Sequence, residues 1–230
     1  MCGRYNIIDD ADVRHLMDVL GVDLYPQTRL NVAPGSLGSI VYDAGMGRTL
    51  DSALWSLLIE PHPGTTGFRP SPRYSTFNAR ADRLGSSPLW KERFANQRAI
   101  VPASGFHEWT GPVGHKQCYN IRGSEGAIAF AGLYEIWEFD GQRVASFTII
   151  TLPAHPRFAH IHPQSVPLML RPEDFDTWLD PQLTHTDPFQ HLLQPQIRVT
   201  LEVAPVRSPN DLKPLTAATT IAADRSAVPG

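Results

Sequence analysis

The chain begins Met1-Cys2-Gly3-Arg4-Tyr5, which places a cysteine directly after the initiator. The Cys2 side chain is small enough for Met1 to be removed routinely, and removal leaves an amine and a thiol on adjacent carbons. Such an aminothiol condenses with an aldehyde to an imine, and its thiol then closes a thiazolidine ring. The amine titrates at about 8 and the thiol at about 8.5, so both nucleophilic forms are accessible near neutral pH. The alternative is that Cys2 is incidental, on a frayed terminus.

Acid and base candidates occur at two further places. Glu108 lies in Gly105-Phe106-His107-Glu108-Trp109, and partial burial against Phe106 and Trp109 should raise its pKa toward a usable range. The segment 153–167 holds His155, His160 and His162, and a loop histidine there is suited to act as an acid or base near neutral pH. No matching cysteine or carboxylate spacing supports a metal site, so we expect no metal and no cofactor.

The one basic region runs from Arg69 to Arg98, and its local charge is +5 because only Asp82 and Glu92 oppose seven basic residues. Basic residues for phosphates, interleaved with aromatic residues for unstacked bases, are what a single-strand binder needs. The alternative is an ordinary solvated face. The basic residues are Arg69, Arg73, Arg80, Arg83, Lys91, Arg93 and Arg98, and the aromatic residues are Phe68, Tyr74, Phe77, Trp90 and Phe94.

The elements that must position these residues are short and mostly strands. One helix should follow Asp9 or Asp10 and stop at Gly21, because Val13, Leu16, Met17 and Leu20 fall on one face. Ser87-Pro88 should begin a second helix, and Asp140-Gly141 is the clearest hairpin turn. We expect strands at 3–8, 39–42, 48–58, 98–102, 116–121, 127–138, 143–151, 166–170 and 197–206, short helices from Pro172 and Asp187, and irregular chain at 24–36 and 60–77.

Composition bounds the class of protein. A chain of 230 residues with 42% hydrophobic content can bury a full core as one domain or two merged ones. Its 21 prolines and 17 glycines favour a strand-rich and loop-rich fold. A net charge of −3 provides no global attraction to nucleic acid or membrane. Two cysteines are no disulfide framework, and Cys118 reads as buried filler. No signal peptide or long apolar run is evident, so we expect an intracellular protein.

An ordered set of motifs resembles the SRAP family of abasic-site processing proteins, from Cys2 to about Pro214. Each motif alone is weak, but in this order, with a cysteine directly after the initiator, the set is highly specific. The motifs are Cys2-Gly3-Arg4-Tyr5, Asn31 with Ala33-Pro34, Asn78-Ala79-Arg80, Pro102 with Gly105 and Glu108-Trp109, Ala131-Gly132-Leu133 with Glu135 and Trp137, and His162 with Pro167.

The resemblance implies an α+β fold in which one SRAP-type domain, here 1–214, has a curved, barrel-like, mainly antiparallel β core and peripheral short helices. The Ala/Thr-rich segment 215–230 is expected to be a disordered C-terminal tail. The implied partner is single-stranded DNA containing abasic sites, bound in a positively charged groove with Cys2 at its floor. We expect a monomer with no membrane association, cytoplasmic and associated with the nucleoid if the source is bacterial.

The resemblance also assigns roles residue by residue. The catalytic residues correspond to Cys2, Asn78, Glu108 and His162, and the DNA-binding residues to Arg4, Tyr5, Arg80 and Trp109, to which the basic region adds Arg69 and Arg73. The histidine block departs from the family pattern His-x-Arg-Met-Pro, because His162-Pro163-Gln164-Ser165-Val166-Pro167 is one residue longer. His160 is therefore an alternative to His162.

These roles predict that the Cys2 amine and thiol form a thiazolidine crosslink with a ring-opened abasic site. An abasic-site lyase activity and autocatalytic removal of Met1 are also expected. One alternative is an N-terminal-nucleophile cysteine amidohydrolase, in which the Cys2 thiol attacks an amide and its own amine serves as base. The other is a non-catalytic DNA-binding module in which Cys2 is incidental.

Overall fold

A computed structural model describes residues 3–112 and 114–224, so Cys2 lies outside the described residues. The strands are β1 (Tyr5–Ile7), β2 (Arg29–Val32), β3 (Leu37–Asp43), β4 (Arg48–Trp55), β5 (Ile59–Pro61), β6 (Phe68–Pro70), β7 (Asn78–Arg80), β8 (Arg98–Ala103), β9 (Gly105–Thr110), β10 (Gln117–Gly123), β11 (Ile128–Phe139), β12 (Gln142–Pro153), β13 (Ser165–Pro167), β14 (Met169–Leu170), β15 (Leu201–Val206) and β16 (Thr219–Ile221). The α-helices are α1 (Ala11–Val19), α2 (Pro88–Asn96) and α3 (Phe175–Leu179), and the 3₁₀ helices are η1 (Ala81–Arg83), η2 (Pro172–Asp174) and η3 (Asp187–Leu193).

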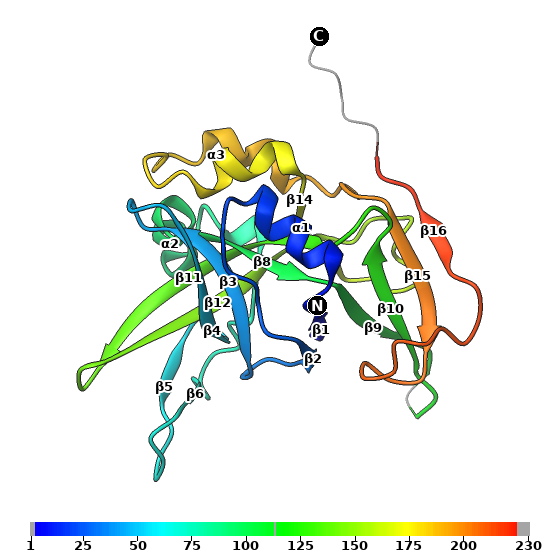
Figure 1. Ribbon diagram of the computed structural model, residues 1–230, viewed down its shortest axis with the longest axis horizontal. Coiled ribbons are helices and arrows are strands. Elements are labelled where there is room, and N and C mark those ends of the chain that lie inside the picture. Colours follow the sequence, from blue (N-terminus) through cyan, green and yellow to red (C-terminus); the bar gives the residue numbers. More distant parts are fainter. Residues whose placement is uncertain (1–2, 113, 225–230) are drawn as a thin grey trace.

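Five strands close into a barrel at the centre of the molecule (Figure 1). β3 pairs with β4 and β8, β11 pairs with β8 and β12, and β12 returns to β4. Most of these pairs are antiparallel, but β12 pairs in parallel with both β4 and β7. Closure removes the open sheet edges that would otherwise need a partner. The predicted barrel-like, mainly antiparallel core with short helices is confirmed.

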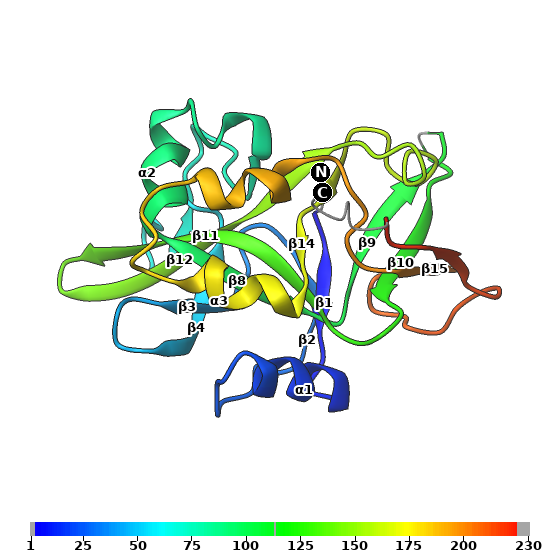
Figure 2. The same ribbon diagram turned by 90° about the horizontal axis from the view of Figure 1, so that it is seen from above.

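A second sheet lies beside the barrel, with the strand order β16-β15-β10-β9-β1-β2 (Figure 1). The chain passes from β8 of the barrel into β9 of this sheet across Ser104, whose hydroxyl accepts a hydrogen bond from the Ile8 N–H at 2.9 Å. Figure 2 shows β1 between the barrel strands and the β9–β10–β15 sheet. The N-terminal strand therefore belongs to the second sheet and lies on the side of that sheet nearest the barrel.

The first helix forms where the sequence predicts it. The Asp10 side chain caps α1 by accepting a hydrogen bond from the Val13 N–H at 3.0 Å. Val13, Leu16 and Met17 are its buried residues. Gly21 follows the helix with φ of 68°, a conformation that glycine adopts without steric cost. The predicted cap and stop of this helix are confirmed.

Three expectations for irregular or extended chain are wrong in part. The segment 24–36 contains β2, and 60–77 contains β6 and the last two residues of β5. The strand expected at 197–206 begins only at Leu201. Local sequence preference misses such short strands because they are held by a partner distant in sequence or by a hairpin.

Part of the segment 215–230, expected to be a disordered tail, forms the edge strand β16, and residues 225–230 lie outside the described residues. β16 pairs antiparallel with β15, with Leu201 opposite Ile221 and Val203 opposite Thr219. Ile221 is buried at 7% exposure and anchors the strand. The Ala/Thr-rich composition suggested disorder here, but β15 offers a free edge whose backbone groups satisfy those of the added strand.

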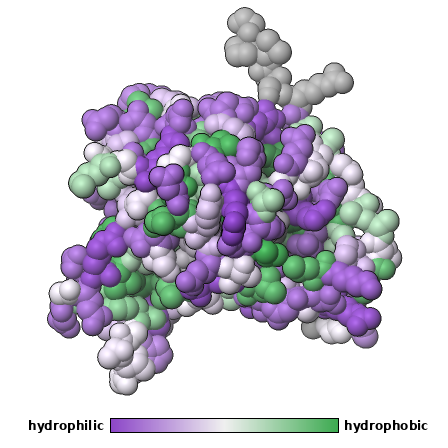
Figure 3. All heavy atoms as spheres, viewed as in Figure 1, coloured by the Kyte–Doolittle hydropathy of each residue, from purple (hydrophilic) through white to green (hydrophobic). Residues whose placement is uncertain are grey.

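The surface seen in Figure 3 consists mainly of side chains of hydrophilic or intermediate hydropathy, and polar residues interrupt its hydrophobic patches. None of the helices within the described ranges is both long enough and apolar enough to span a membrane.

Candidate active site

The N-terminal strand runs alongside the strand that carries Glu108. β1 pairs antiparallel with β9, with Tyr5 opposite Phe106. The His107 N–H donates a hydrogen bond to the Arg4 carbonyl oxygen at 2.9 Å. Arg4 is therefore held beside the residue that precedes Glu108.

Core contacts fix the position of β1. The Tyr5 side chain is fully buried and its ring meets Trp55 edge to face, with centroids 5.2 Å apart. Gly38 lies under the Tyr5 hydroxyl so closely that a Cβ there would overlap it. The Tyr5 side chain has no exposed surface, so it anchors the N-terminal strand in the core, and its assignment to DNA binding stays a prediction.

Asn31 explains part of the Asn31-Val32-Ala33-Pro34 motif by backbone geometry. Its φ is 54°, a left-handed conformation that asparagine tolerates better than most residues. The pairing of β1 with β2 shifts register between Tyr5 and Ile7, as at a β-bulge. The Asn31 N–H donates to the Asn6 side-chain oxygen at 2.6 Å. The motif thus shapes the strand next to β1.

Glu108 and His162 meet inside the protein. Their side chains approach to 3.2 Å between Glu108 Oε2 and His162 Nδ1. Burial raises the pKa of the Glu108 carboxyl to about 7, and only 4% of the residue is exposed. Its other oxygen, Oε1, has no hydrogen-bond partner among the described residues. Glu108 therefore exchanges between the acid and the carboxylate near neutral pH, as the sequence predicted.

His162 differs from the expected loop histidine that titrates near neutral pH. Burial lowers the pKa of its imidazole to about 4, so the ring is neutral at pH 7. The contact with Glu108 is then a hydrogen bond that shares one proton, rather than an ion pair between two charges. The direction of that hydrogen bond follows the protonation state of Glu108.

Geometry separates the two rival histidines. His162 contacts Glu108, whereas the His160 side chain is exposed and its backbone carbonyl accepts a hydrogen bond from the Thr110 hydroxyl at 3.4 Å. His162 contacts the carboxylate even though the histidine block is one residue longer, and the 155–162 segment that leads to it is wound into turns. Within these turns the N–H groups of Ile161 and His162 both donate to the Phe158 carbonyl at 3.0 Å.

Asn78 begins β7, where it pairs with Ile149 of β12 and is 8% exposed. The preceding residue, Phe77, meets Trp55 edge to face at 6.1 Å between ring centroids, and its carbonyl accepts a hydrogen bond from Trp55 Nε1 at 2.7 Å. Since Trp55 also contacts Tyr5, one aromatic cluster ties the start of β7 to the N-terminal strand.

The predicted DNA-binding cations have different surroundings. Arg80 is exposed at the end of β7 and pairs with Asp82 through two hydrogen bonds of 2.6 and 3.0 Å. This pairing lowers the pKa of the Asp82 carboxyl. Arg69 pairs with Glu60 at 2.7 Å, and Arg73 is exposed. Trp109 lies half-buried beside Glu108 on β9.

The +5 segment is only partly a surface. Arg98 is buried at 4% exposure, where it donates to the carbonyls of Trp178, Phe94 and Asp180 and so ties α3 to β8. Arg93 pairs with Glu135 of β11. Two of the seven cations therefore hold the fold together, which a charge count along the sequence does not reveal.

Two further polar residues near Arg80 could not be found from the sequence. A cavity of about 480 Å³ is lined by Arg80, Asp82, Thr151, Gln164 and Ser165, among others. Thr151 is 2% exposed and Ser165 is 8% exposed, and neither hydroxyl has a hydrogen-bond partner among the described residues. Buried hydroxyls without partners are costly, so they are suited to meet a ligand. The register of β12 with β7 and β13, which the sequence does not reveal, brings them together.

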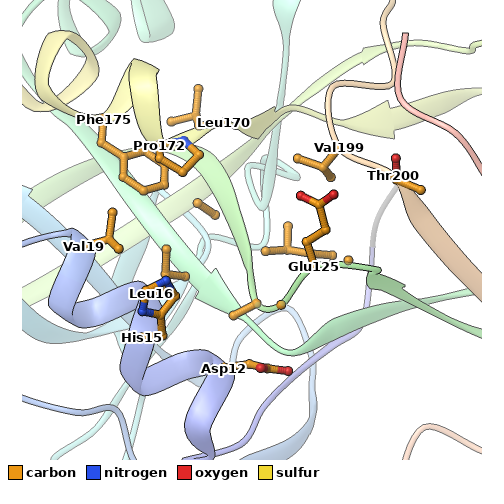
Figure 4. A pocket seen from close by; sticks show the side chains of 15 residues that line it. Asp12, His15, Leu16, Val19, Glu125, Leu170, Pro172, Phe175, Val199 and Thr200 are labelled. Atoms are coloured by element: carbon orange, nitrogen blue, oxygen red, sulfur yellow. The ribbon is translucent and has the colours of Figure 1, made fainter.

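Other candidate groups lie elsewhere or are unreactive. A smaller cavity of about 190 Å³ lies between α1, α3 and the β10–β11 turn, and Figure 4 shows Asp12, His15 and Glu125 around its apolar floor. Neither Glu108 nor His162 lines it.

Burial raises the pKa of the Cys118 thiol to about 11, which confirms it as buried filler. Over 3–112 and 114–224, no cluster of three or more His, Cys, Asp or Glu residues could hold a metal ion.

Comparisons with known proteins agree with one another. The family model described as SOS response associated peptidase (SRAP) matches residues 1–209. The abasic site processing protein YoqW of Bacillus subtilis is 30% identical over 217 residues, covering 90% of this chain and 93% of the relative. The abasic site processing protein YedK of Escherichia coli is 28% identical over 163 residues, covering 70% and 69%. A crystal structure of a protein from Bordetella bronchiseptica superposes with a TM-score of 0.65 at 19% identity, covering 90% and 100%.

Proposed function

The chain belongs to the SRAP family, and from this premise we propose that it binds single-stranded DNA and joins Cys2 covalently to abasic sites. The observation that carries the proposal is the buried Glu108–His162 pair beside the N-terminal strand. β1 runs antiparallel to β9, and Arg4 lies opposite His107. Arg4 thus lies opposite the residue that precedes Glu108, and this proximity is why we assign the pair to the chemistry of the N-terminal residue.

The reaction uses the open-chain aldehyde of the abasic sugar. The Cys2 amine, freed by removal of Met1, attacks C1′ to give a carbinolamine, which loses water to form an imine. The Cys2 thiolate then adds to C1′, the imine nitrogen takes up a proton, and a thiazolidine ring results. Ring closure is intramolecular, so it benefits from a high effective molarity and outcompetes hydrolysis of the imine.

Glu108 supplies the proton transfers around the amine. As a carboxylate it takes a proton from the attacking amine, and as an acid it protonates the hydroxyl that departs as water. A pKa of about 7 makes both forms available at neutral pH. Its buried Oε1, which has no partner among the described residues, is the oxygen suited to this exchange.

His162 serves sugar opening as a relay. Because the pKa of His162 is about 4, its imidazole is not protonated at pH 7 and cannot act as an acid from the imidazolium form. A protonated Glu108 instead donates to Nδ1 while Nε2–H donates to the sugar O4′, so that one proton moves through a ring that is neutral before and after. As the C1′–O4′ bond breaks, the C1′ hydroxyl becomes the aldehyde carbonyl and releases its proton to water. The 3.2 Å contact between Glu108 and Nδ1 supports this route.

The remaining residues hold the DNA. Arg4 and Arg80 are assigned to phosphates, with Arg69 and Arg73 as outlying cations and Trp109 as a stacking surface for a base. Asn78 orients the amine or a phosphate as a neutral group. Thr151 and Ser165 line the cavity beside Arg80 and offer hydroxyls to the same backbone.

Two further activities follow from the same intermediate. An imine at C1′ permits β-elimination of the 3′ phosphate, so we propose an accompanying abasic-site lyase activity. Removal of Met1 is required, because a peptide-bonded Cys2 nitrogen is no nucleophile, and we propose that the chain removes Met1 itself.

The test uses purified protein and single-stranded DNA carrying one abasic site, separated on a denaturing gel. We expect a heat-stable shifted band that is lost in Cys2→Ala and forms more slowly in Glu108→Ala. Mass spectrometry should show wild-type protein without Met1. Absence of the band from such protein would refute the proposal, and amide hydrolysis in its place would favour an amidohydrolase.

A further inference from the structure

The C-terminal segment reaches back into the body of the molecule. The family model ends at residue 209, yet the described chain continues to 224 with defined contacts. β16 pairs with β15, the Ala223 N–H donates to the Thr200 hydroxyl at 3.1 Å, and Asp224 follows. This segment therefore lies outside the matched region but inside the folded structure.

Asp224 is the point where this segment meets two other loops. Its backbone N–H donates to the Ile197 carbonyl at 2.7 Å, and its Oδ2 accepts from the Ile197 N–H at 2.8 Å. The same Oδ2 lies 3.3 Å from His155 Nε2, and Oδ1 pairs with Arg157. Arg157 also donates to the Ala222 carbonyl at 2.6 Å. One carboxylate thus joins the C-terminal segment to the loop that follows β12.

That loop is the one that carries His162. His155 Nδ1 accepts from the Arg157 N–H at 3.2 Å, so Nε2 is the nitrogen that donates to Asp224. The His155 carbonyl accepts from the Phe158 N–H at 2.9 Å, and the Phe158 carbonyl accepts from the His162 N–H at 3.0 Å. Phe158 is fully buried and its ring contacts Phe106, two residues before Glu108. A continuous set of hydrogen bonds therefore connects Asp224 to His162.

We propose that Asp224 is a positioning residue, which acts through His155 and Arg157 to hold the 155–162 loop so that His162 stays in hydrogen-bond contact with Glu108. Without the carboxylate, the first turn of this loop loses its anchor while Phe158 keeps the loop folded onto the core. The expected loss is therefore one of alignment at His162 rather than of the fold. The inference rests on the proposed function for its kinetic readout.

The experiment compares Asp224→Asn with Glu202→Gln. Glu202 lies on β15, next to β16, and pairs with Arg122 away from the histidine loop, so its variant controls for loss of a neighbouring carboxylate. Crosslinking is measured in single turnover at saturating abasic DNA, and DNA affinity is measured separately. We expect Asp224→Asn to slow the saturating rate about 10-fold, because small misplacements of a reacting group lower rates steeply. We expect DNA affinity to change less than about 2-fold, and Glu202→Gln to leave both quantities unchanged.

A double-mutant cycle separates positioning from general destabilisation. In a His162→Ala background, Asp224→Asn should have no further effect on the rate, because the residue through which it acts is gone. An equal loss in both backgrounds, or no loss in Asp224→Asn alone, would overturn the proposal. If Asp224→Asn folds poorly, Arg157→Gln removes the other side of the same contact and must give the same pattern.

A second readout does not depend on the reaction. The imidazole NMR signals of His162 are recorded in wild type, Asp224→Asn and Glu202→Gln, and we expect them to move in Asp224→Asn alone. Wild-type protein without crosslinking would refute the proposed function, while shifted signals would still support the positioning role. Unmoved signals would refute the positioning role whatever the activity.

Discussion

Glu108 is a carboxyl that the fold keeps from water, and this has a cost for stability. Burial raises its pKa from 4.5 to about 7, so the folded state holds a proton that the unfolded state releases between these values. Stability contributed by the neutral acid is present at pH 4 and is lost as the pH rises through about 7. Above that pH the protein carries a buried charge at full cost.

Glu108→Gln should therefore stabilise the protein at alkaline pH while impairing crosslinking. The pKa difference corresponds to about 3 kcal/mol, at about 1.4 kcal/mol per pKa unit. This value is the upper limit for the gain in free energy of unfolding at pH 8. At pH 4 we expect no gain. Urea unfolding at both pH values measures it. Equal stability of wild type and variant at pH 8 would contradict the buried charge.

The pH dependence of crosslinking provides a separate test of the same residue. The reaction needs a neutral amine, which titrates at about 8, and a Glu108 able to donate, which titrates near 7. These requirements predict a bell-shaped dependence of the rate on pH, with its maximum between about pH 7 and 8. The two apparent pKa values of this profile belong to the amine and Glu108 as a coupled pair.

Glu108→Gln cannot lose a proton, so its slower reaction should keep the rise in rate with pH but lose the fall above the maximum. Rates from pH 5.5 to 9.5 with saturating DNA measure this. If the rate of the variant still decreased above the pH maximum, that decrease would come from the titration of another group.

For single residues, the sequence identified which residue types carry the chemistry, but it was less informative about how deeply each side chain is buried. The aromatic neighbours of Glu108 correctly predicted the direction of its pKa shift, because burial follows from such neighbours. The shift of His162 was not foreseen, since a loop histidine offers no sequence pattern that reports its burial. The burial of Tyr5 was not foreseen either, because a family motif records that a residue matters and does not say whether it faces DNA or the core.

Among the elements, β1 is the one on which the site depends, and Gly38 of β3 sets how closely it packs. A methyl group at Gly38 would overlap the Tyr5 hydroxyl and touch the Phe147 ring. Gly38→Ala should therefore destabilise the protein by about 1–3 kcal/mol, as overpacked cores do, and slow crosslinking by displacing the strand that leads to Cys2.

Gly85→Ala is the matched control, because a Cβ there meets nothing within 4 Å and the backbone φ is not positive. Thermal unfolding and crosslinking rates of both variants test the idea. If Gly38→Ala unfolded like Gly85→Ala and reacted at the wild-type rate, the tight packing of β1 would not matter for the site.

Elements with strong local patterns were predictable, and those made by partners were not. The α1 cap, the Pro88 start of α2 and the Asp140-Gly141 turn all depend on neighbouring residues, and the structure confirms them. β16 forms because β15 has an open edge, and β5 and β6 pair only with each other. The cavity hydroxyls of Thr151 and Ser165 likewise depend on the register between distant strands.

On the scale of the whole molecule, a net charge of −3 means that affinity for DNA must come from a local set of exposed cations. Arg93 and Arg98 are committed to the fold, and Arg69 is half-buried and paired with Glu60. The exposed cations of the basic segment are therefore Arg73, Arg80, Arg83 and Lys91. Arg80 is the one placed beside the cavity, and its pairing with Asp82 competes with a phosphate.

Two substitutions with opposite effects test this competition. Arg80→Ala should weaken binding of single-stranded DNA and lower the slope of log affinity against log salt by about 0.7, the value for one phosphate contact on a single strand. Asp82→Asn should strengthen binding, because Arg80 then contacts a phosphate without first breaking its ion pair with the Asp82 carboxylate. Arg122→Ala, which removes an equally exposed cation paired with Glu202, is the control and should change neither quantity. Fluorescence anisotropy across a range of salt concentrations measures affinity and slope together. Weakening by Arg122→Ala equal to that by Arg80→Ala would mean that total charge, and not the site beside the cavity, governs DNA binding.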